Sequence, residues 1–205
     1  MLSPIARQLL VQHYQRMFEP LNDCPVAVRT NTVPGYPQLS LMRMLSRRPD
    51  GQLMQVLATI GASETKLPRR EGIPGRRNEY VTFLPADWDL EAPEHRWIMD
   101  LLADVADFAA EERTDFYYAD RLDLHVGTAL EHADDDVNMV GCMLLAPLNN
   151  EDEDFMTCRT GLFTRVNIIH IMPITAEELE GERAGLRERF YPASGEPCYL
   201  CARRR

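Results

Sequence analysis

The spacing of apolar residues predicts a chain in which strands outnumber helices. Apolar residues that return every three or four positions indicate amphipathic helices, whereas short apolar runs rich in β-branched residues indicate strands. Helical spacing marks residues 4–18 and a longer segment that begins at Pro93, where the missing N–H of a proline costs nothing. Strand-like segments follow one another at residues 26–30, 39–46, 52–60, 80–84, 122–126, 138–146 and 166–172.

The strand at residues 166–172 is the one around which we expect the rest of the fold to be built. It is apolar on both faces, which is typical of a strand buried between two layers. Pro173 cannot donate a ladder hydrogen bond, so the strand is predicted to end there. Thr175 and Glu178 then form the T-x-x-E pattern of a capping box and predict a new helix. Almost complete burial is expected for Val166, Ile168 and Ile171.

Residues 39–46 and 52–60 are predicted to pair as a β-hairpin. The Pro-Asp-Gly sequence at residues 49–51 supplies the turn, because proline presets its own φ and glycine tolerates a positive one. Both faces of the second arm are mostly apolar, which indicates a sheet covered on both sides. Residues 61–78 contain three glycines, two prolines and four arginines, and we expect them to form a mobile loop.

These elements predict a single-domain α/β protein of the α+β type. Several strands precede the middle helix, so the sheet should be mixed and largely antiparallel, with helices packed on it. A chain of 205 residues is long enough for one well-cored domain, and its 45% hydrophobic content is that of a globular protein. The sequence has neither an apolar run long enough to span a bilayer nor a signal peptide, which predicts a cytoplasmic protein.

The charge distribution favours a protein partner over a nucleic acid. The net charge is −10, yet residues 81–160 alone carry four basic and twenty acidic side chains, a balance of −16. Nucleic-acid binding needs a basic footprint, whereas an acidic surface suits a basic protein. Eight of these acids lie in two predicted loops, which we call the acidic segments, and we expect them to bind the partner. They are Glu131, Asp134, Asp135 and Asp136 in the first segment, and Glu151, Asp152, Glu153 and Asp154 in the second.

No motif of a known catalytic or nucleotide-binding site is present in the sequence. It lacks the G-x-S-x-G elbow, the G-x-x-x-x-G-K-[ST] loop and the G-x-G-x-x-G turn. A metal-dependent hydrolase that uses His125, His132 and the aspartates at 134–136 is the alternative, although their spacing matches no common metal motif. Cys198 and Cys201 form a C-x-x-C pair, but a zinc site needs four ligands. We therefore expect no catalytic, cofactor-binding or metal-binding residues.

Five motifs follow one another along the chain in a recognisable order. They are residues 57–63 (LATIGAS), residues 78–85 (NEYVTFLP), the helix with Trp97 and Leu101, residues 120–122 (DRL) and residues 166–179 (VNIIHIMPITAEEL). Together they resemble the suppressor-of-fused-like domain, specifically its short bacterial members. The resemblance extends over residues 25–190, which leaves an N-terminal helix and lead-in at 1–24 and a C-terminal tail at 191–205.

The resemblance implies an α/β domain with no known catalytic activity. The animal relative is a larger protein that sequesters a zinc-finger transcription factor through an extra region, which this chain is too short to contain. Bacterial members have been proposed as immunity proteins that bind and neutralise toxins. The resemblance therefore implies a non-enzymatic protein-binding module, an immunity protein that neutralises a toxin, and the acidic charge favours a basic toxin. We expect it to need no cofactor and to bind neither nucleic acid nor membrane.

Overall fold

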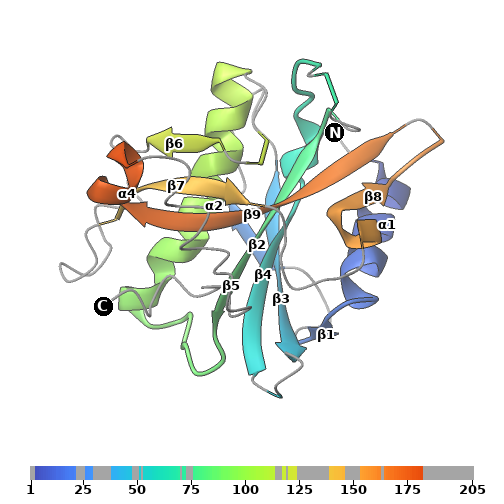
Figure 1. The fold of residues 1–205 in the computed structure, drawn as a ribbon. Helices are drawn as coiled ribbons and strands as arrows, with labels where there is room; N and C mark the ends of the chain where they lie inside the picture. Colours follow the sequence, from blue (N-terminus) through green and yellow to red (C-terminus); the bar gives the residue numbers. More distant parts are fainter. Residues whose placement is uncertain are drawn as a thin grey trace.

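Strand β9 (Arg165–Thr175) crosses the middle of a nine-stranded sheet, as Figure 1 shows. The computed structural model describes residues 3–21, 26–29, 38–47, 51, 53–69, 71–72, 76–113, 117–118, 120–123, 139–145, 153–162 and 164–181. Within them the sheet order is β1-β3-β4-β5-β9-β7-β6, with β2 paired to β3 and β8 paired to β9. The other strands are β1 (Glu19–Pro20), β2 (Val26–Arg29), β3 (Leu39–Arg47), β4 (Leu53–Ile60), β5 (Asn78–Pro85), β6 (Arg121–Asp123), β7 (Met139–Leu145) and β8 (Thr157–Arg159).

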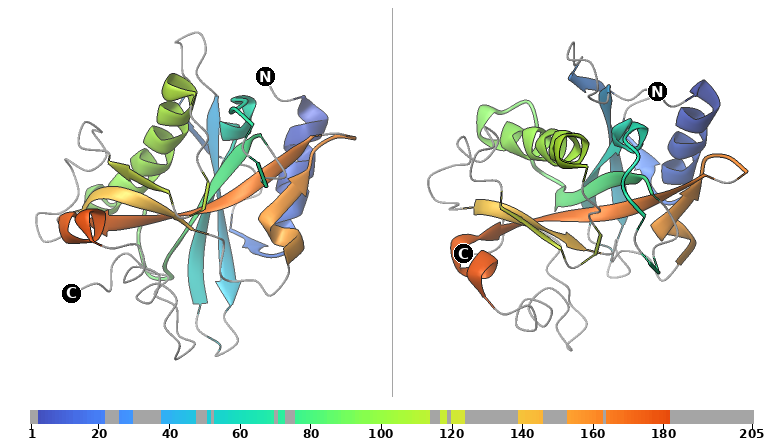
Figure 2. Two further views of the ribbon diagram at one scale, coloured as in Figure 1. Left: turned by 45° about the horizontal axis from the view of Figure 1, so that its top comes forward. Right: turned by 90° about the horizontal axis from the view of Figure 1, so that it is seen from above.

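The predicted fold class is confirmed. The sheet is mixed because β5 and β9 pair in parallel, and it is largely antiparallel because the remaining pairs run in opposite directions. Helices α1 (Pro4–Gln15) and α2 (Pro93–Glu112) lie on opposite sides of the β3-β4-β5 part of the sheet (Figure 2). The shorter helices are α4 (Ala176–Glu180) and the 3-10 turns η1 (Ala62–Glu64) and η2 (Glu153–Met156).

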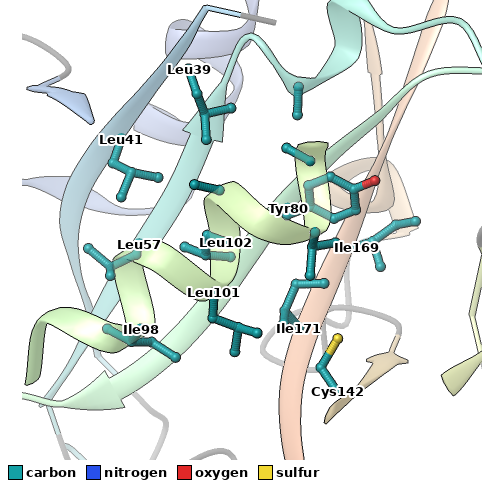
Figure 3. Packing of buried hydrophobic residues seen from close by; sticks show 14 of the residues in the cluster. Leu39, Leu41, Leu57, Tyr80, Ile98, Leu101, Leu102, Cys142, Ile169 and Ile171 are labelled. Atoms are coloured by element: carbon teal, nitrogen blue, oxygen red, sulfur yellow. The ribbon is translucent and has the colours of Figure 1, made fainter. Parts of the chain in front are cut away.

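Successive residues of the central strands alternate between two hydrophobic cores. Leu57 and Tyr80 pack under α2 in the first core, whereas their neighbours Val56 and Val81 belong to the second core with Leu10 of α1. This two-residue period is the geometry of an extended strand, whose side chains point to opposite faces in turn. Figure 3 shows the first core, where α2 contributes Ile98, Leu101 and Leu102. The expectation of a sheet covered on both faces is confirmed.

Strand β9 contributes to every core of the described structure. Val166 and Ile168 belong to the core with α1, Ile169 and Ile171 to the core under α2, and Met172 and Ile174 to a third cluster beside α4. The burial expected for Val166, Ile168 and Ile171 is confirmed, because each is 0% exposed. The strand therefore links all three cores.

The predicted end of this strand at Pro173 is wrong. The strand continues to Thr175, and Pro173 lies opposite Cys142 of β7. Pairing with β5 ends at His170, so Pro173 lies where β9 is bordered by β7 on one edge only among the described strands. A strand accepts proline where one edge has no ladder, because no hydrogen bond is lost there.

Two local predictions from turn and cap chemistry are confirmed. β3 and β4 pair as an antiparallel hairpin, and Gly51 in the turn has a φ of 86°. Thr175 caps α4, since its side chain accepts from the Glu178 N–H and the Glu178 carboxylate accepts from the Thr175 N–H. No helix in the described part of the chain has the length and apolar character to cross a membrane.

Candidate functional site

A buried carboxylate, that of Glu79, lies at the junction of β4, β5 and η1. Glu79 is 0% exposed, and four donors surround its two oxygens. Oε1 accepts from the N–H of Gly61 at 2.9 Å, the N–H of Ser63 at 3.1 Å and the hydroxyl of Ser63 at 2.6 Å. Oε2 accepts from the hydroxyl of Thr59 at 2.6 Å, which itself accepts from the Tyr80 N–H. The carboxylate thus joins the end of β4 and the first turn after it to β5.

The segment after β4 is held on its outer side as well. Arg77 donates to the carbonyls of Ser63 and Glu64, and Arg7 of α1 forms a 2.9 Å ion pair with the Glu64 carboxylate. Further along, Leu67 is buried and exchanges two hydrogen bonds of 2.8 Å with Arg76. The prediction of a mobile loop over residues 61–78 is therefore wrong for residues 61–67 and 76–78, because carboxylate and guanidinium groups fix their backbone.

The surroundings of Glu79 give it a structural role. Burial raises the pKa of the Glu79 carboxyl above its ordinary value of 4.5, while the hydrogen bonds from Ser63, Thr59 and Gly61 oppose that shift. A general acid or base must reach its substrate, whereas this carboxyl has no exposed surface and both oxygens contact groups of the chain. We therefore assign Glu79 to the fold and not to catalysis.

The described residues form an open groove of about 540 Å³ between α1 and the β8–β9 hairpin. Arg16 at the end of α1, Arg159 of β8 and Arg165 of β9 line it, together with Gln12 and His13 of α1. The remaining lining residues are Leu9, Thr157 and Cys158. Every charged side chain among these lining residues is basic, so they make the groove electropositive on a chain whose net charge is −10.

His13 positions one of these arginines. Its Nε2 lies 2.9 Å from the Phe155 carbonyl, and because a carbonyl can only accept, Nε2 carries the proton. Nδ1 is then the acceptor for Nη2 of Arg16, at 2.8 Å. The imidazole is buried and stacked on the Phe155 ring, with 5.4 Å between ring centroids. This contact holds the Arg16 guanidinium beside the groove.

The predicted partner-binding residues lie for the most part outside the described structure. Glu131, Asp134, Asp135, Asp136, Glu151 and Asp152 all fall outside it; Glu153 and Asp154 begin η2. The two acidic segments are separated along the chain by β7, as the sequence predicted. Their role in binding therefore stays a prediction.

The predicted metal ligands and the C-x-x-C pair cannot be placed either. His125, His132, Cys198 and Cys201 lie outside the described residues. Among the residues that are described, no group of three or more His, Cys, Asp or Glu side chains could hold a metal. The described cysteines, Cys142 and Cys158, are buried free thiols, and burial raises the pKa of Cys158 to about 11.

Sequence reasoning identified neither the carboxylate network nor the basic groove. For Glu79 the signal was weak, because this acid comes directly before the strand predicted at residues 80–84 and follows the polar residue Asn78. For the groove no local signal exists, because Arg16, Arg159 and Arg165 come from three separate elements. Only the tertiary structure brings them together.

Comparisons with known proteins identify the same family that the order of the sequence motifs resembles. The family model described as Suppressor of fused protein (SUFU) matches residues 35–185. The structure is similar to a putative SUFU homolog from Neisseria gonorrhoeae FA 1090, with a TM-score of 0.59 at 14% identity over 95% of this chain and 92% of that one. It is also similar to the Sufu–Fu complex crystal structure, with a TM-score of 0.55 at 12% identity over 85% and 75% of the two chains.

A third similar structure is larger than this chain. Drosophila Suppressor of Fused aligns with a TM-score of 0.57 at 13% identity over 95% of this chain but only 48% of its own length. The present chain thus spans about half of that protein. No curated protein matches the sequence significantly. These structural likenesses establish a shared fold, and because the family model matches most of the sequence, the chain belongs to the Suppressor of fused protein (SUFU) family.

Proposed function

We propose that this chain is a non-enzymatic protein-binding module that acts as an immunity protein against a basic toxin. The observation that carries the proposal is the family match over residues 35–185. A SUFU structure with the same fold was solved as a complex with Fu, so the fold can serve protein binding in that relative. The concentration of acidic charge in residues 81–160 supports a basic partner.

The acidic segments are the part of the chain to which we assign the basic partner. They contain Glu131, Asp134, Asp135 and Asp136, followed after β7 by Glu151, Asp152, Glu153 and Asp154. Carboxylates gathered over short stretches repel one another, and this repulsion opposes folding. A basic partner removes the repulsion and is attracted over a distance set by the ionic strength.

Neutralising the first acidic segment is expected to slow association. The partner to be used is the protein encoded beside the gene of this chain. Asp134, Asp135 and Asp136 are changed together to Asn, and the on-rate is measured by stopped flow. Electrostatic steering should make the variant about tenfold slower than the wild-type protein at low salt. The difference should disappear as salt rises from about 0.01 M to about 0.1 M, where the Debye length falls from about 30 Å to about 10 Å.

A matched control removes three acids elsewhere on the surface. Glu19, Glu71 and Glu112 are exposed, and none of them belongs to the acidic segments. Changing them together to Gln alters the net charge by the same amount, so a general charge effect would slow both variants equally. An unchanged on-rate with an unchanged salt slope in the Asp134, Asp135 and Asp136 variant would contradict this site of binding.

A further inference from the structure

We propose that the groove between α1 and the β8–β9 hairpin binds an acidic peptide segment of a protein partner. The groove is a second binding surface with the opposite charge to the acidic segments, so the proposal goes beyond a single contact with a basic toxin. Figures 1 and 2 show the hairpin projecting from the body of the sheet beside α1. Arg16, Arg159 and Arg165 reach the groove from the helix and from the two arms of the hairpin.

Two of the three arginines face each other across the hairpin. Arg159 of β8 and Arg165 of β9 are direct partners in the antiparallel register, so their side chains emerge on the same face. Like charges at such positions destabilise a sheet. The ion pairs of the described residues are Arg7 with Glu64 and Arg43 with Glu91, so neither Arg159 nor Arg165 is neutralised there. An anionic ligand would remove this repulsion.

The third arginine is fixed in place by a neutral histidine. Nη2 of Arg16 donates to Nδ1 of His13, while Nε2 of His13 donates to the Phe155 carbonyl. Only one N–H of the guanidinium is used in this contact, so the other N–H groups of this planar cation remain available to a ligand. The buried imidazole thus orients a charged group at the groove without neutralising it.

The chemistry of the groove favours carboxylates over phosphate. Phosphate sites commonly use the free N–H groups at a helix N-terminus, whereas this groove lies along the C-terminal half of α1, from Leu9 to Arg16. Its cationic groups are side-chain guanidiniums, which bind carboxylates and phosphates alike in a bidentate manner, so the position along α1 is what favours carboxylates. Gln12 and Thr157 add side chains that can hydrogen-bond to a peptide backbone. A volume of about 540 Å³ and an open form suit a short extended segment.

An exposed apolar side chain lies in the same hairpin as two of the groove arginines. Leu162, in the turn between β8 and β9, is 95% exposed. A single exposed leucine is ordinary on a protein surface. Leu162 lies between the paired arginines in the sequence, so it offers an apolar contact to a residue that flanks the acids of the bound segment. The preferred ligand is therefore a run of Glu or Asp followed or preceded by an apolar residue.

Binding of a labelled penta-glutamate peptide, followed by fluorescence anisotropy, tests the proposal. The full chain should bind this peptide and not a penta-lysine peptide. Arg159→Glu should weaken binding at least tenfold, because it removes one guanidinium and adds a repulsive carboxylate. The same change places opposite charges across the β8–β9 pair, so the Tm of the variant should equal or exceed that of the wild-type protein. Weaker binding without loss of stability separates a ligand site from a folding defect.

The control variant changes two arginines away from the groove. Arg69 and Arg96 are exposed, and changing both to Glu alters the net charge by more than Arg159→Glu does. This variant should bind the peptide within about twofold of the wild-type affinity. Three results would overturn the proposal: no binding of penta-glutamate by the wild-type chain, equal weakening by the control, or displacement of the peptide by inorganic phosphate at lower concentration than by free glutamate.

Discussion

Replacing Glu79 with alanine is expected to lower the free energy of unfolding by about 4 kcal/mol or more. The reason is that four donors converge on this buried carboxylate, from Thr59, Gly61 and Ser63. Each donor left without an acceptor in the interior costs about 1–3 kcal/mol. Guanidinium denaturation followed by circular dichroism measures the change.

Two further variants separate the network from burial alone. Glu79→Gln keeps the shape of the side chain but replaces one acceptor with a donor. It should therefore lower the free energy of unfolding, but by less than Glu79→Ala does. Glu64→Gln changes a neighbouring acid that contacts Arg7 near the surface and should cost less than about 1 kcal/mol. A loss below about 1 kcal/mol for Glu79→Ala would show that the carboxylate does not hold the turn.

The titration of Glu79 gives the network a pH signature. Burial raises the pKa of this carboxyl in the folded protein above its value of about 4.5 in the unfolded chain. At a pH between the unfolded and the folded pKa, the folded state therefore binds more protons than the unfolded chain. The contribution of Glu79 to stability is then largest below the unfolded pKa and falls as the pH rises through the folded pKa. The stability difference between wild type and Glu79→Gln should accordingly shrink as the pH rises above about 4.5. A difference that grows with pH would mean a lowered pKa.

Gly61, directly after β4, should not tolerate a side chain: Gly61→Ala is expected to lower the free energy of unfolding by about 3–5 kcal/mol. Gly61 has a φ of 122°, which favours glycine, and a Cβ there would lie 2.1 Å from the backbone oxygen of Gln38. A backbone carbonyl cannot move aside as a flexible side chain can. The substitution would also displace the Gly61 N–H from the Glu79 carboxylate.

Gly51 supplies the matched control for this prediction. It also has a positive φ, of 86°, but no atom lies within 4 Å of the position that a Cβ would occupy. Gly51→Ala should therefore lower the free energy of unfolding only by the cost of a positive φ for alanine, about 1–2 kcal/mol. Equal losses of unfolding free energy in the two variants would rule out the close approach of Gly61 to Gln38.

The parts of the fold that depend on local sequence could be predicted. The β3–β4 hairpin follows from Gly51 and its flanking strands, and the α4 cap follows from Thr175 and Glu178, because these signals act over a few residues. The burial of β9 followed from its composition alone. The very short strands β1 and β8 were missed, since two or three residues show no period.

Features that depend on tertiary contacts could not be predicted. Pro173 was expected to end β9, but whether a proline is tolerated depends on which edge of the strand is paired. The composition of residues 61–78 resembles that of a mobile loop, but Glu79 and Arg77 hold Gly61, Ser63 and Glu64 in place. Arg16 is far in sequence from Arg159 and Arg165, so no local pattern could join the three groove arginines. The acidic segments, by contrast, were evident from charge alone, and their function stays a prediction.

The central claim, that this chain acts by binding a protein and not by catalysis, is tested most directly by titration against its partner. Expression of the protein encoded beside this gene is expected to stop growth, and co-expression of this chain to restore it. With both proteins purified, inhibition of the toxin should rise linearly with added chain and saturate at a fixed stoichiometric ratio. Active toxin should be recovered when the complex is dissociated. Permanent inactivation of many toxin molecules by one chain would reveal an enzyme, and the absence of both complex and rescue would contradict the account.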